Sequence, residues 1–147
     1  MSATARIHAG GAALVAGLFN KTVSQGTNIY LGLRTLDGAG GHPSDAAAAD
    51  SLTSNLQEVS GGGYSRASIT INSTNLAITT SGSNSVITFT ATVFNFSGSI
   101  SGITHAFIAT TSDNSGSLIA SAPLQVTRNV ANGDSITVTF VLTINAG

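Results

Sequence analysis

The sequence predicts an all-β fold, an antiparallel β-sandwich of the jelly-roll or immunoglobulin-like type. Short segments rich in β-branched residues follow one another closely through the second half of the chain. Within several of them, apolar and hydroxyl side chains alternate, as expected of strands with one buried face. Turns rich in Gly, Asn and Ser separate the segments. The chain has 147 residues, and we expect residues 1–147 to form one domain with a substantial core.

Two segments depart from this β pattern. Residues 1–22 are expected to be helical, with a short helix over residues 3–20, because Ile7, Leu14 and Leu18 recur at helical spacing. Gly10, Gly11 and others weaken that helix, so it would need packing to persist. Residues 37–57 are rich in Gly and Ala and are expected to form a long exposed loop.

The expected strands follow in order along the chain, and they cover residues 28–35, 66–72, 76–80, 86–93, 103–111, 118–124 and 136–144. Residues 103–111 are apolar on both parities, which is typical of a central strand. Turns are expected at 81–84, 112–116 and 132–134, where Gly, Asn and Asp gather.

Side-chain parity predicts which residues of the last strands face the core. Residues 86–93 should direct four side chains inward, namely Ile87, Phe89, Ala91 and Val93. Residues 136–144 should direct five inward, namely Ile136, Val138, Phe140, Leu142 and Ile144. Because Phe94 and Phe96 have the opposite parity to Phe89, we expect a bulge or a covered apolar patch near them.

The composition narrows the possible partners. Only 7% of the residues are charged, against about 25% in a typical domain, and the net charge is −1. Such a chain offers no basic patch for nucleic acid and no field for an anionic membrane, so we expect neither partner. It has no cysteine, no apolar run long enough to cross a membrane and no clear signal peptide. Low charge favours association, so either a hydroxyl-rich exterior or a surface covered by neighbouring subunits fits the composition.

Residues 58–66 divide the loose first third of the chain from the run of strands, and they read Glu-Val-Ser-Gly-Gly-Gly-Tyr-Ser-Arg. Gly61, Gly62 and Gly63 allow positive φ angles or a close approach of another backbone segment. Tyr64 and Arg66 would share one face of a strand. Arg66 is placed to pair with Glu58 across the glycine turn. These six residues and His105 are our candidates for structural or interface roles.

The familiar signatures of catalysis are missing from the sequence. His8, His42 and His105 have no partner at metal-ligand spacing, and we expect His105 to be a hydrogen-bonded histidine of the core or an interface. The three glycines lack the Lys and the following helix of a phosphate loop, and Ser60 lacks the Gly-x-Ser-x-Gly elbow. We therefore expect no catalytic residue, no cofactor and no metal site, although spacing alone does not exclude a pair of catalytic carboxylates.

Several segments together resemble a family of small tailed-bacteriophage virion proteins of the tail-fibre-like or head-decoration type. The resemblance rests on residues 28–33 (Asn-Ile-Tyr-Leu-Gly-Leu), 58–66 as the family block Glu-x-Ser-Gly-Gly-Gly-Tyr-x-Arg, 84–89, 102–108 (Gly-Ile-Thr-His-Ala-Phe-Ile), 117–120 and 130–134. The family usually carries a Trp before the Thr-His strand, where this chain has Phe94 or Phe96.

The resemblance implies a non-enzymatic structural protein that is assembled in the host cytoplasm and resides in the virion. Two roles follow. In the favoured one, the protein is a capsid cement or decoration protein that bridges major capsid subunits through many modest contacts. In the other, it is a tail or tail-fibre component that contacts the host surface. The expected partners are the major capsid protein or other virion proteins, and further copies of the chain in a homo-oligomer, a trimer being one arrangement. A cellular β-sandwich and an unrecognised hydrolase remain as lesser alternatives.

Overall fold

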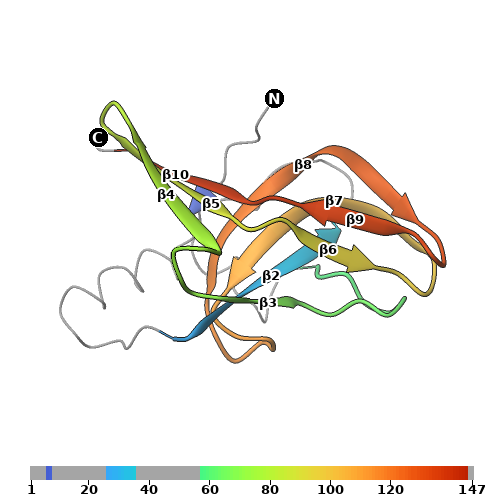
Figure 1. The fold of residues 1–147 in the computed structure, drawn as a ribbon. Coiled ribbons are helices and arrows are strands. Elements are labelled where there is room, and N and C mark those ends of the chain that lie inside the picture. Colours follow the sequence, from blue (N-terminus) through green and yellow to red (C-terminus); the bar gives the residue numbers. More distant parts are fainter. Residues whose placement is uncertain (1–5, 8–25, 36–56, 146–147) are drawn as a thin grey trace.

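The structure, a computed structural model, describes residues 6–7, 26–35 and 57–145. This part of the chain contains ten β-strands. The strands are β1 (Arg6–Ile7), β2 (Asn28–Thr35), β3 (Ala67–Thr70), β4 (Leu76–Ser81), β5 (Asn84–Phe89), β6 (Thr92–Asn95), β7 (Ile100–Ala109), β8 (Leu118–Val130), β9 (Ser135–Val138) and β10 (Val141–Asn145). They form three antiparallel sheets, and the predicted β-sandwich is confirmed (Figure 1).

The largest sheet has five strands in the order β1-β8-β7-β2-β3. It faces a second layer made of a three-stranded sheet, β10-β5-β4, and a two-stranded sheet, β6-β9. β7 lies in the middle of the five strands, as its apolar residues on both parities predicted. The expected strand over residues 28–35 is confirmed without a shift of either end.

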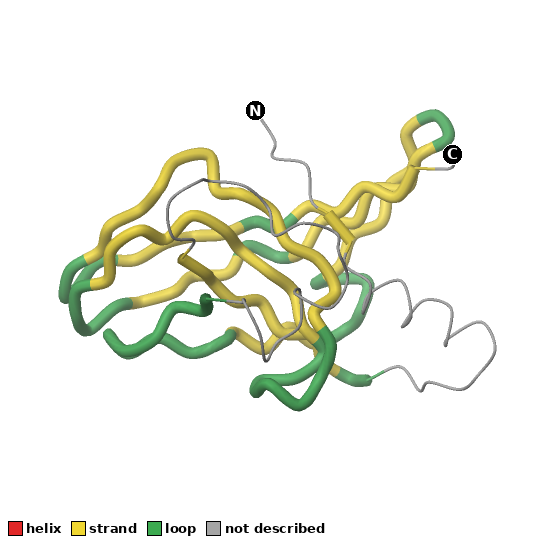
Figure 2. The backbone as a smooth tube through the Cα atoms, turned by 180° about the vertical axis from the view of Figure 1, so that it is seen from behind, coloured by secondary structure: helices red, strands yellow, loops and turns green. Residues whose placement is uncertain are grey.

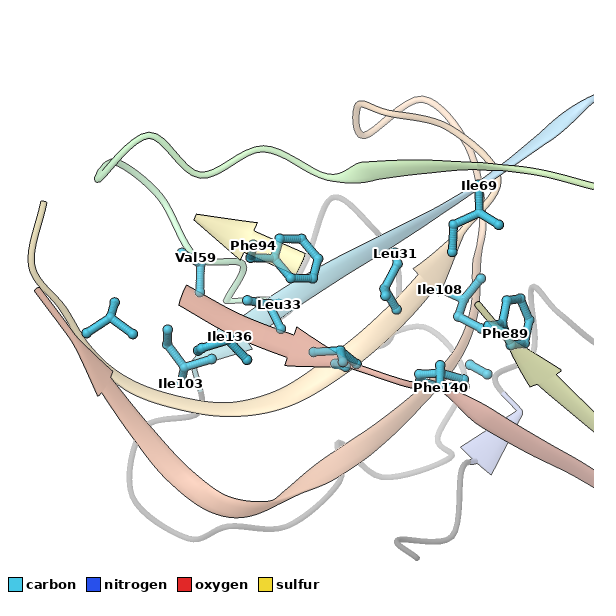
Figure 3. Packing of buried hydrophobic residues seen from close by; sticks show 14 of the residues in the cluster. Leu31, Leu33, Val59, Ile69, Phe89, Phe94, Ile103, Ile108, Ile136 and Phe140 are labelled. Carbon is cyan, nitrogen blue, oxygen red and sulfur yellow. The ribbon is translucent and has the colours of Figure 1, made fainter. Parts of the chain in front are cut away.

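The core fills the space between the two layers. Buried side chains from the five-stranded sheet, among them Leu31, Leu33 and Ile108, meet Phe94, Ile136 and Phe140 of the opposite layer (Figure 3). The alternation of apolar and hydroxyl residues explains this arrangement, because successive residues of a strand point to opposite faces. Thr137 and Thr139, which alternate with Ile136, Val138 and Phe140, are left on the outside of the sandwich.

Two long strands expected from the sequence are each divided in the structure. Residues 84–95 form β5 and β6 with a break at Thr90 and Ala91, and residues 135–145 form β9 and β10 with a break after Val138. The two breaks meet: the Phe89 N–H donates to the Phe140 carbonyl at 2.9 Å, and the two rings pack edge to face at 5.7 Å. At this point both strands leave one sheet and enter the other.

The division corrects the predicted parity. Ile87 and Phe89 do face inward, but Val93 is 53% exposed, whereas Phe94 and Phe96 are buried. The irregularity expected near the two phenylalanines is therefore real, and it resets the alternation because the extra residues at the break turn the strand over. Ile144 was also expected inward and is 43% exposed.

The predicted N-terminal helix is wrong at Arg6 and Ile7, which form β1 and pair with Ser121 and Ala120 of β8. A partly unpaired sheet edge satisfies the backbone groups of these residues better than a helix weakened by glycines. The rest of residues 1–22 lies outside the described residues, and so does the expected loop 37–57 except for Gln57. The carbonyl of Gln57 accepts a 2.8 Å hydrogen bond from the Thr35 N–H.

β8 is longer than expected and strongly curved (Figure 1). It pairs with β7 near both ends, and the innermost pairs on the two sides of the irregularity are His105 with Pro123 and Ile103 with Arg128. Between these pairs β7 advances by two residues and β8 by five, so the middle of β8 arches away from its neighbour. A cleft of about 650 Å³ lies between this part of β8 and β9-β10.

Candidate functional site: the glycine block

The three glycines form a tight left-handed turn. Their φ angles are 77° at Gly61, 56° at Gly62 and 74° at Gly63, so the positive φ expected of them is present at all three. The turn docks on the segment that joins β6 to β7, where the Ser97 N–H donates to the Gly62 carbonyl at 2.8 Å. A Cβ on Gly62 would lie 3.1 Å from the carbonyl oxygen of Gly98. Gly62 is thus required for close approach as well as for its φ angle.

The Gly62→Ala variant is expected to lose about 2 kcal/mol of folding free energy, through left-handed strain and the contact with Gly98 together. Gly61→Ala is the matched control, since its φ is similar but nothing lies within 4 Å of a Cβ there. It should lose only about 1 kcal/mol. Urea denaturation of both variants measures the difference; equal losses would show that the contact with Gly98 adds nothing to the cost of the positive φ, and no loss in either variant would show that the glycines act only as a flexible spacer.

The turn brings Glu58 and Arg66 together in a two-pronged ion pair. Arg66 Nε donates to Glu58 Oε1 at 2.8 Å, and Nη2 donates to Oε2 at 2.6 Å. The Arg66 side chain is only 2% exposed and that of Glu58 is 22% exposed. The pairing expected from the sequence is therefore present, in the fork-to-fork geometry that makes Arg–carboxylate contacts strong and directional.

Tyr64 completes this cluster. Its hydroxyl donates to Glu58 Oε1 at 2.9 Å and accepts the Leu33 N–H at 2.8 Å, and its ring stacks on Phe94 with centroids 5.9 Å apart. The tyrosine thereby joins β2 to the opposite layer of the sandwich. Burial raises the pKa of Tyr64 far above its ordinary value, and the negative charge of Glu58 acts in the same direction.

This raised pKa predicts a loss of stability at high pH. Above pH of about 10, a tyrosine in the unfolded chain loses its proton whereas folded Tyr64 keeps it. The unfolded state then binds fewer protons, so the free energy of unfolding falls by about 1.4 kcal/mol per pH unit. In Tyr64→Phe this contribution should vanish. The free energy of unfolding, measured by urea denaturation, should then fall less steeply from neutral to alkaline pH than in the unmodified protein. Parallel profiles for the two proteins would contradict the prediction.

Arg66 also reaches the turn between β7 and β8. Its Nη1 donates to the carbonyls of Thr111, at 3.1 Å, and of Asp113, and Nη2 donates to Asn114 Oδ1 at 2.7 Å. The guanidinium carbon lies 5.2 Å from the centre of the Phe107 ring, within the range of a cation–π contact. One side chain thus holds the Glu58 segment, the centre of β7 and the 111–114 turn in a fixed arrangement.

His105 lies apart from this cluster, in β7. It is 1% exposed, and its Nδ1 is 2.8 Å from Thr104 Oγ1, so the expectation of a hydrogen-bonded buried histidine is met. Its neighbour across the sheet is Arg34, which in turn forms a β-bridge with Glu58. Whether His105 or the glycine block takes part in an interface stays a prediction.

Sequence reasoning missed two residues of this region, Gly32 and Arg34. Gly32 has no space for a side chain, because a Cβ there would lie 2.8 Å from the Tyr64 hydroxyl and closer still to the Phe107 ring. Arg34 is fully buried. In the sequence, the only indication is that Gly32 and Arg34 share one face of β2. That pattern predicts a face different from an ordinary apolar one, but it does not predict which residues contact it.

The cluster of Glu58, Tyr64 and Arg66 holds neighbouring segments of the protein together. Glu58, Tyr64 and Arg66 bond to one another and to the backbone, so their polar groups are committed to structural contacts. Within residues 6–7, 26–35 and 57–145, no group of three or more His, Asp or Glu side chains is placed to hold a metal ion. In the same part of the chain, no helix is long and apolar enough to cross a membrane.

Comparison with protein-family models matches residues 9–142, most of the chain, to the family described as podophage GP4 fiber I protein gp80. None of the curated proteins compared matches the chain. The family match covers β2 to β9 and therefore includes the glycine block and its partners. It supports the phage virion origin that the sequence resemblance implied, and the family is described as one of fibre proteins. The chain belongs to the podophage GP4 fiber I protein gp80 family.

Proposed function

We propose that this protein is a non-enzymatic structural subunit of a phage fibre, built into the virion through contacts with further copies of itself and with other virion proteins. The observation that carries the proposal is the family match over residues 9–142. It supports the second of the two roles expected from the sequence, a tail or fibre component, over the first, a capsid cement protein.

The character of the described surface is consistent with a structural subunit. The exposed large apolar side chains are all aliphatic, namely Ile78, Val93, Val126 and Ile144. Binding hot spots are usually rich in Trp, Tyr and Arg, so this surface gives little support to a host-receptor site on this domain. The internally bonded Glu58, Tyr64 and Arg66 favour a rigid framework over catalysis.

Immunogold labelling of intact virions with antibodies against this chain tests the proposal, together with the copy number of the chain relative to the major capsid protein. Label on fibres with few copies per particle is the expected result. Label over the head, in a number comparable to that of the capsid subunits, would overturn the fibre role and establish the cement role. Under both the fibre role and the cement role, we propose that the protein is assembled in the host cytoplasm and resides in the virion.

A further inference from the structure

The three-stranded sheet β10-β5-β4 extends beyond the body of the sandwich. Figure 2 shows its hairpin leaving the rest of the protein as a narrow projection, which we call the arm and define as residues 76–88 and 141–145. Its pairing is regular: β4 and β5 pair residue by residue from Leu76 with Phe89 to Ser81 with Asn84, without a shift. The arm is therefore an ordered ladder. Its inner end packs on the core, and its outer end projects beyond the five-stranded sheet in the part of the chain that the structure describes.

One face of the arm continues the hydrophobic core outward. Ile78 pairs with Ile87, and Ile87 pairs with Leu142, so these three side chains share a face. Near the body that face is buried, with Phe89 at 3% and Leu142 at 6% exposure. Farther out it is open, with Ile78 at 68% and Ile144 at 43% exposure.

The opposite face of the arm is different in kind. Thr79 pairs with Val86, and Val86 pairs with Thr143, whereas nearer the body Thr88 lies between Ala77 and Val141, so threonines and smaller apolar residues are mixed there. Thr79 and Thr143 are both exposed, as expected of hydroxyl side chains that face water. An isolated exposed apolar residue is ordinary on a protein surface, but a row that continues the core across three strands is the kind of patch that marks an interaction site.

The charge distribution indicates what covers this face. Residues 67–112 and 135–147 contain no Asp, Glu, Lys or Arg, so the arm itself carries no charge from these residue types, and neither do β6 and β9, into which its strands β5 and β10 connect. A contact between identical copies places like residues near one another, and charged residues in such a contact would repel. A neutral apolar face meets a second copy of itself without that cost, whereas it offers nothing to attract an acidic or basic partner.

The edge strand of the arm also favours a contact with a second copy of the chain. β4 is the last strand of its sheet in the described part of the chain. It has no proline, no charge and no bulge, which are the usual devices that keep an edge strand of a monomer from pairing with another chain. An edge left without these devices is expected to be covered in the assembled protein.

From these observations we propose that the apolar face of the arm, formed by Ile78, Ile87 and Ile144, is a self-association surface that packs against the arm of a second copy of this chain. This rests on the proposed function, because it names the surface through which fibre subunits contact one another. The contact buries the exposed isoleucines and leaves the threonine face in water.

Single-cysteine variants test the proposal directly, since the chain has no cysteine of its own. The rate of maleimide labelling is measured for Ile78→Cys in dilute and in concentrated protein, with Thr79→Cys, its neighbour on the opposite face, as the matched control. The rate at position 78 is expected to fall severalfold in concentrated protein, while the rate at position 79 stays unchanged. Equal rates at position 78 under both conditions would overturn the proposal, as would equal protection of both positions.

Sedimentation velocity supplies the second readout. The unmodified protein should sediment as an oligomer and Ile78→Lys as a monomer with an unchanged far-ultraviolet spectrum, whereas Thr79→Lys should remain oligomeric. An oligomer that persists in Ile78→Lys, or an unmodified protein that is monomeric at its highest soluble concentration, would contradict the arm contact. Virion labelling is independent of these outcomes: fibre label with a monomeric protein overturns only the arm contact, and head label overturns only the fibre role.

Discussion

The Gly32→Ala variant is expected to lose about 3 kcal/mol of folding free energy, the cost of forcing one methyl group into a fully packed site. The methyl group would lie 2.5 Å from Phe107 Cε1 and 2.8 Å from the Tyr64 hydroxyl. Phe107 is completely buried, so its ring has no open space into which to move. The same shift would weaken the hydrogen bond between the Leu33 N–H and Tyr64.

A second substitution identifies the cause of this loss. Phe107→Leu removes the part of the ring that the new methyl group would meet, so Gly32→Ala combined with Phe107→Leu should be more stable than the sum of the two single losses predicts. Gly26→Ala serves as a control, because the nearest atom to a Cβ there is 3.5 Å away, an ordinary contact. Thermal and urea denaturation give the values, and strictly additive losses would show that the Phe107 contact does not limit position 32.

Glu58→Ala is expected to lower the free energy of unfolding by about 3 kcal/mol and the melting temperature by about 10 °C. The loss arises chiefly from Arg66, whose side chain is 2% exposed and would remain as a buried charge without its carboxylate. We place the value at the lower end of the range for buried pairs, because Glu58 itself is 22% exposed and partly screened by water.

A double-mutant cycle with Arg66→Met separates the ion pair from the other contacts of each residue. When both partners are replaced, no buried charge remains, so the double variant should be more stable than the sum of the single losses predicts, by about 1 to 3 kcal/mol. Arg66→Met alone should also loosen the 111–114 turn, visible as faster amide hydrogen exchange there than in Glu58→Ala. A coupling near zero would show that the pair contributes only through its separate contacts.

Much of the fold could be predicted from local pattern. Short runs of apolar and β-branched residues identified β2, β4, β7 and the start of β8, and Gly, Asn and Asp marked several of the turns. The glycine block was also readable, since three consecutive glycines with Glu and Arg on either side fit a left-handed turn closed by an ion pair. These features depend on residues that are near one another in the sequence.

The features that were missed depend on distant partners. The strands change sheets at Thr90 and at Phe140 because these two points contact each other across the fold. Neither segment of the sequence by itself predicts that contact. Arg6 and Ile7 form a strand because an edge of β8 is available to them. The need for glycine at position 32 comes from Phe107 and Tyr64, which approach it from other strands.

The meeting of the two breaks has a mechanical consequence for the proposed role as a fibre subunit. β5 continues covalently into β6, and β10 follows β9, so two of the three strands of the arm run directly into the core of the sandwich. The ladder bonds between β5 and β10 lie across the strand direction. Tension applied along the arm would therefore load these bonds together in shear, instead of opening them one at a time, and the Phe89–Phe140 contact would carry that load into the core.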